Sequence, residues 1–133
     1  MKEAVKSAAK IKAKVALVDQ NVTITIKKLF KTLTFREYFR FFADIVKGLI
    51  FRKSEIEPFD LNKIPSEKII EKMVGLVKDR YPSVYKVLIS DRNEYMARRI
   101  ISLMKTNPDQ KIIAIVGAGH QKGMIKIIKK AIS

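Results

Sequence analysis

Apolar residues recur along most of the chain at the three- and four-residue spacing of amphipathic helices. This spacing predicts helices over 1–13, from Thr34 to about Phe51, from Ser66 to Tyr81, from Ser90 or Asp91 to Asn107, and after His120. Thr34 followed by Glu37 is a capping-box pair, which favours a helix start at that point. The β-branched residues of 22–31 leave that segment ambiguous, and we favour a helix there, with a further short helical turn over 83–89.

Two apolar runs lack helical spacing. Residues 15–18 lead into Asp19, and residues 112–116 lead into Gly117 and His120. Unbroken runs of this length are typical of strands buried on both faces of a parallel sheet. Two strands are few for a stable sheet, so further strands must come from outside this chain. The sequence therefore predicts a helix-rich α/β fold with a small parallel sheet that is incomplete in this chain, and one loop over 52–65.

The helix predicted from Thr34 to Phe51 has an unusually broad apolar face rich in phenylalanine and tyrosine. Its polar positions form only a narrow stripe. Ordinary core or dimer packing of this face is the interpretation that we favour. The alternative is a helix lying on an anionic membrane surface, with a set of basic side chains that reach for lipid headgroups, namely Arg36, Arg40, Lys47, Arg52 and Lys53.

Composition limits the chemistry available to the chain. Its 133 residues include 28 Lys and Arg against 13 Asp and Glu, a formal net charge of +15, which favours anionic partners. The absence of cysteine excludes disulfides, thiolate metal sites and a cysteine nucleophile. No secretory signal or membrane-spanning stretch is evident, so we expect a cytoplasmic protein, with membrane association left open. Nucleic acid ranks low as a partner because the basic residues are scattered over every helix.

Candidate functional residues gather in two segments. Gly117 and Gly119 lie where a predicted strand turns into a helix, a position at which ligands bind in open α/β sheets. The dinucleotide pattern fails because Lys122 stands where its third glycine belongs. His120, the single histidine, suits a metal ligand or a general base, although a cap or surface role is the commoner one. Arg92 stands near a helix start, where its charge opposes the helix dipole, so it needs another partner.

Two motifs resemble those of a known family. Residues 88–97 read LISDRNEYMA and residues 112–123 read IIAIVGAGHQKG. Together they are similar to the two C-terminal motifs of the TraB family, in the same order and at a similar separation. Residues 14–29 also resemble a strand of that family that ends in an aspartate. The resemblance covers nearly the whole chain.

The resemblance implies an α/β domain related to the Tiki and GumN-type proteins, which are proposed or known metal-dependent peptidases, and a role in shutting down peptide pheromone signalling. It implies that His120 and Arg92 are catalytic, that His120 is a metal ligand, and that Gly117, Gly119 and Asn93 contact substrate. The complete domain would use a divalent metal of unknown identity, whereas no cofactor is expected for this chain alone.

By the same resemblance, residues 1–133 are the C-terminal portion of a TraB-like domain. The family's G-x-x-H segment, its acidic residue and its C-terminal membrane region are absent, so the chain should be inactive alone. Expected partners are the missing N-terminal part or a second chain, a peptide substrate, an anionic membrane surface, and other copies in a homo-oligomer. Gln20 replaces a family arginine and Asp91 a glutamate, which weakens the case for an intact site. The alternative is a non-catalytic basic protein that attaches to anionic membrane or nucleic acid.

Overall fold

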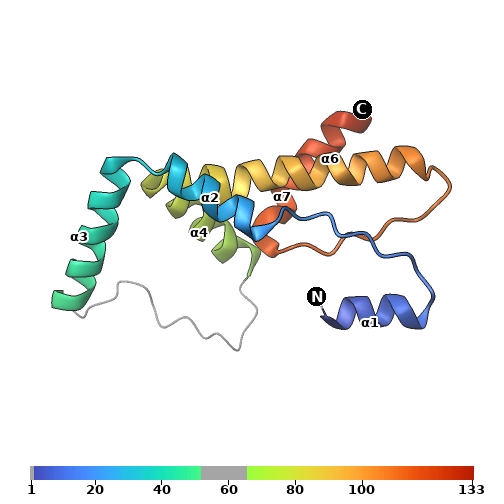
Figure 1. Ribbon diagram of the computed structural model, residues 1–133, viewed down its shortest axis with the longest axis horizontal. Helices are drawn as coiled ribbons and strands as arrows, with labels where there is room; N and C mark the ends of the chain where they lie inside the picture. The colour runs from blue at the N-terminus through green and yellow to red at the C-terminus, as the bar shows by residue number, and fades with distance from the viewer. Residues whose placement is uncertain (1, 52–65) are drawn as a thin grey trace.

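Helices form all the regular structure in the computed structural model, which describes residues 2–51 and 66–133 (Figure 1). In chain order they are α1 (Lys2–Lys10), α2 (Val22–Thr32), α3 (Phe35–Phe51), α4 (Glu67–Arg80), α5 (Pro82–Tyr85), the π-helical turn η1 (Lys86–Ser90), α6 (Asp91–Thr106) and α7 (Ala118–Ile132). The helix-rich fold is therefore confirmed. The loop predicted over 52–65 lies outside the described residues.

Local capping explains where two of the predicted helices begin. The Asn21 side chain accepts a hydrogen bond from the backbone N–H of Thr23 at 2.8 Å, and so starts α2. The capping box of α3 forms as predicted. The Thr34 N–H donates to Glu37 Oε2 at 3.0 Å, and the Glu37 N–H donates to Thr34 Oγ1 at 3.3 Å.

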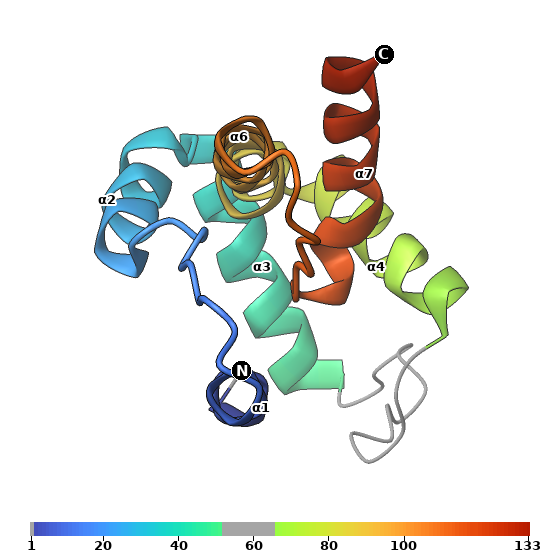
Figure 2. The same ribbon diagram turned by 90° about the vertical axis from the view of Figure 1, so that its right-hand side faces the viewer.

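The core is small and lies between α6 and α7. Its centre is formed by the buried side chains of Met96, Ile100 and Met124, and the partly buried Val18 and Val116 pack against them. Viewed down α6, α2 lies on one side of it and α4 and α7 lie on the other (Figure 2). Within the described ranges, no helix combines the length and the apolar character that crossing a bilayer requires.

The predicted parallel sheet is absent from the described residues. Residues 13–18 and 111–117 are extended and run in the same direction, but they are not paired as strands (Figure 1). Residues 14–18 and 111–116 make no backbone hydrogen bond to any described residue. Leu17 and Ile113 are 76% and 79% exposed. An apolar run becomes a strand only when a neighbour takes up its backbone groups, and the described chain supplies no such neighbour.

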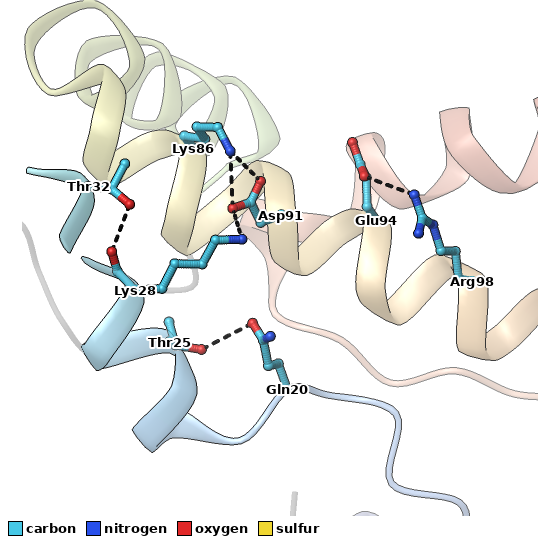
Figure 3. A network of polar contacts seen from close by, with 8 residues as sticks. All are labelled: Gln20, Thr25, Lys28, Thr32, Lys86, Asp91, Glu94 and Arg98. Atoms are coloured by element: carbon cyan, nitrogen blue, oxygen red, sulfur yellow. Dashed lines mark hydrogen bonds and ion pairs between the residues drawn. The ribbon is translucent and has the colours of Figure 1, made fainter. Parts of the chain in front are cut away.

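The chain stays helical from Pro82 to Thr106, which corrects the prediction of a separate cap at Ser90 or Asp91. Ser90 has helical backbone angles and makes no side-chain cap. The wide π-helical turn before it leads directly into α6. Asp91 instead links the start of α6 to α2 and η1 through ion pairs. Its carboxylate lies 2.5 Å from Lys28 Nζ on α2 and 3.1 Å from Lys86 Nζ on η1 (Figure 3).

Candidate active site around His120 and Arg92

His120 and Asn93 meet between the first turns of α7 and α6. Both residues are buried, at 8% and 5% exposed, and His120 Nδ1 lies 2.8 Å from Asn93 Oδ1. An amide oxygen can only accept, so Nδ1 carries the proton and Nε2 keeps a lone pair. Nε2 bonds to no other described residue, and no buried side-chain nitrogen or oxygen of the described residues lacks a partner. The lone pair of Nε2 is therefore open to solvent.

Gly123 makes this pairing possible. It lies one turn after His120 on α7, directly against the Asn93 amide. A Cβ atom at this position would collide with Asn93 Nδ2 and would lie 3.1 Å from Asn93 Cγ. Only glycine therefore leaves room for the amide that holds the imidazole. Gly123 was not among the predicted site residues.

Arg92 makes a two-point ion pair with Asp19. Arg92 Nη2 lies 2.6 Å from Asp19 Oδ2, and Arg92 Nε lies 3.2 Å from Asp19 Oδ1. The prediction that Arg92 needs a partner beyond the helix dipole is confirmed. Asp19 was not among the predicted site residues. The sequence feature that could have identified Asp19 is its position directly after an apolar run, where ligand-binding groups collect in α/β proteins.

The charges around His120 favour its neutral form. Burial lowers the pKa of His120 below its usual range, and the positive charge of Arg92 lowers it further, against a smaller opposing effect from Asp19. The hydrogen bond from Arg92 holds the pKa of Asp19 below its ordinary value. At neutral pH the site is thus an uncharged imidazole beside a carboxylate–guanidinium pair.

The two glycines predicted to contact substrate do not need to be glycine for the backbone to turn. Gly117 caps α7 with a φ of −63°, which any residue can adopt. A Cβ atom would lie 3.5 Å from His120 Cδ2 at Gly117 and 3.6 Å from Val74 Cγ2 at Gly119, both ordinary contacts. Their role in substrate binding remains a prediction.

Two open hollows flank the cluster. One, of about 430 Å³, is lined by residues that include Gln20, Lys28 and Arg98. The other, of about 490 Å³, lies between α4 and α7 and includes Asn93 and Gly119. The side chain of His120 lines neither hollow.

The described residues of this chain do not by themselves fit a resident metal ion. No group of three His, Asp or Glu side chains that could ligate one occurs among residues 2–51 and 66–133. His120 offers a single nitrogen, and the nearby carboxylate of Asp19 is engaged by Arg92. A hydrolytic zinc site commonly needs three protein ligands. Any metal bound at His120 would take its other ligands from outside these residues.

The link between Arg92 and His120 can be tested by titration. Replacing Arg92 with glutamine removes a positive charge, so the pKa of His120 should rise. Because the chain has a single histidine, its ring resonances in NMR report this pKa directly. Arg98→Gln, a change at an exposed arginine paired with Glu94, is the control and should leave the pKa unchanged. An unchanged or lower pKa in the Arg92 variant would contradict the described arrangement.

Comparison with known proteins agrees with the motifs. The TraB/PrgY/gumN family pattern matches residues 1–131. An uncharacterized protein of Methanocaldococcus jannaschii is 31% identical over 130 residues, which are 98% of this chain and 32% of that protein. The TraB domain-containing protein of Homo sapiens is 24% identical over 94% of this chain and 36% of its own length. The chain thus spans about a third of the length of these relatives. No solved structure matches it.

Proposed function

We propose, since the chain belongs to the TraB/PrgY/gumN family, that it carries one half of a hydrolytic site that acts on peptides. The observation that carries this proposal is the buried, neutral His120, oriented through Nδ1 by Asn93, with Arg92 near enough for its charge to lower the pKa of the imidazole. A neutral imidazole with one nitrogen fixed and the other open can accept a proton from water or ligate a metal ion. Asn93 in this proposal is a positioning residue.

Arg92 is suited to hold an anionic group of the substrate. Its guanidinium is fixed by Asp19 from one side and by a longer contact from Nη1 to the Leu88 carbonyl at 3.5 Å. Arginine binds carboxylates through two parallel hydrogen bonds and stabilises negative charge that develops during hydrolysis. We propose that Arg92 binds the substrate carboxylate or the anionic intermediate, and that Asp19 keeps the guanidinium in place.

The other half of the site, in this proposal, comes from a segment outside the chain. The relatives are about three times as long as the part of them that this chain matches. Residues 14–18 and 111–116 run in the same direction with unpaired backbone groups and exposed aliphatic side chains. These are the properties expected of parallel strands whose neighbouring strand is missing. A further strand there would end close to Asp19 and His120, where it could supply the missing ligands.

The proposal predicts a conditional activity. The chain alone should not hydrolyse peptides. Mixed with, or fused to, the remaining part of the Methanocaldococcus jannaschii relative, it should hydrolyse them in a reaction that His120→Ala and Arg92→Ala each lower by about 100-fold or more. Arg98→Ala is the matched control and should retain activity. Hydrolysis by the chain alone, lost on His120→Ala, would disprove the claim that the site is incomplete.

A non-catalytic role remains the second candidate, supported by the net charge of +15. A protein that binds nucleic acid through that charge should lose affinity steeply as salt rises, because released counterions set the slope. Tight binding that persists at physiological salt, together with an inactive completed domain, would favour this candidate over the hydrolase.

A further inference from the structure

Helix α3 attaches to the rest of the chain through its polar edge. The buried Glu37 side chain accepts the backbone N–H of Ser83 at 2.7 Å. Asp44 accepts from Arg80 Nε at 2.7 Å and from the Tyr81 hydroxyl at 2.5 Å. Both acidic residues of α3 are thus turned towards the junction of α4 and α5.

This attachment leaves the aromatic side chains of α3 largely exposed, and Figure 1 shows the helix at one end of the molecule. The exposed fractions are 85% for Phe35, 76% for Phe39, 67% for Phe42, 48% for Tyr38 and 45% for Ile45. Phe41 is 58% exposed, and its ring also packs edge-on against Tyr81 with centroids 6.5 Å apart. The favoured prediction was core or dimer packing of this face, and of the two, core packing is not found among the described residues.

Cationic side chains border the exposed face. Arg36 and Lys47 are eleven residues apart, which is close to three helical turns, so they lie on one edge of α3. Both are exposed. Because the acidic side chains bond inward, the outward surface of the helix combines large aromatic rings with positive charge.

We propose that α3 docks this aromatic face in the headgroup region of an anionic bilayer. Aromatic rings favour the boundary between headgroups and acyl chains, and bordering arginine and lysine side chains bind anionic lipid. The net charge of +15 makes copies of the chain repel one another while it attracts an anionic surface, which favours lipid over a second copy. This proposal is independent of the hydrolytic site.

Flotation with phosphatidylcholine vesicles, with and without phosphatidylserine, tests the docking. The chain should float only with the anionic vesicles at low salt. The double variant Phe39→Ser/Phe42→Ser keeps every charge and the Phe41–Tyr81 contact, and its bound fraction should fall by about tenfold or more. Phe30→Ser, at a phenylalanine that is 64% exposed on α2, is the matched control and should float like the unchanged chain.

Three outcomes would overturn the proposal. The first is an unchanged chain that stays unbound at low salt, which removes membrane docking altogether. The Phe30 variant could lose binding as strongly as the double variant, which makes the attraction non-specific. Sedimentation could show a dimer that the double variant dissociates, and then a second copy covers this face. Circular dichroism of each variant establishes that the helices remain folded.

Discussion

Replacing Gly123 with alanine is expected to destabilise the folded chain by about 1–3 kcal/mol and to break the hydrogen bond between Asn93 and His120. The added methyl group would overlap the Asn93 amide, so the amide must leave its position beside His120. The imidazole would then lose the acceptor that fixes its protonated nitrogen. Urea denaturation measures the stability, and the NMR shifts of the His120 ring report its tautomer.

Alanine at Gly75 is the matched control. A Cβ at this α4 position meets no atom within 4 Å, so the change should stabilise the chain by about 1 kcal/mol through the helix preference of alanine. Equal effects at the two glycines would mean that helix propensity, and not the space beside Asn93, decides the result. An unchanged His120 tautomer in the Gly123 variant would likewise contradict its role at the site.

Local signals in the sequence were sufficient to predict most helices. The Thr34 and Glu37 pair marks the start of α3 because capping depends on residues three positions apart. The prediction of two strands was wrong, because strand pairing depends on residues far apart in the sequence. The apolar runs at 15–18 and 112–116 have the composition of buried strands, but pairing requires a neighbouring backbone that the described chain lacks.

The candidate site could be predicted only in part. Arg92 and His120 stood out by their positions at helix starts, and the structure brings both close to Asp19. The position of Asp19 after an apolar run marks it as a candidate, but its pairing with Arg92 joins residues 73 positions apart, and no local pattern predicts that pairing. The close approach of Gly123 to Asn93 was also missed, since it depends on how α6 and α7 cross.

The orientation of α3 was beyond sequence reasoning as well. A narrow polar stripe on a helix usually faces water while the apolar face is buried. Here the two acids of the stripe face inward, because they accept hydrogen bonds from donors on the junction of α4 and α5, 36 to 46 residues away. The sequence shows the apolar and the polar face of α3 but not which of them packs against the rest of the chain.

Glu37→Ala is expected to release α3 from this junction. Burial alone would raise the pKa of Glu37, but hydrogen bonds from Ser83 and Thr34 outweigh it and lower the pKa to about 2. Removing the carboxylate leaves the Ser83 N–H without its acceptor and takes one partner from the capping box. Hydrogen bonds to a charged group contribute about 1.5–3 kcal/mol, so exchange of the Ser83 amide should accelerate by roughly 10- to 100-fold.

The same contact predicts a pH dependence with a definite sign. The pKa of Glu37 is lower in the folded chain than its ordinary value of 4.5, so the stabilisation is complete above that value and is lost as pH falls towards about 2. The protection of the Ser83 amide should therefore weaken on acidification in the unchanged chain and respond less in Glu37→Gln, which cannot titrate. Glu94→Ala is the control, because its exposed pair with Arg98 contributes little. If Ser83 exchanges at the same rate in the unchanged chain and in Glu37→Ala, Glu37 does not hold α3, and the outward orientation of the aromatic face must have another cause.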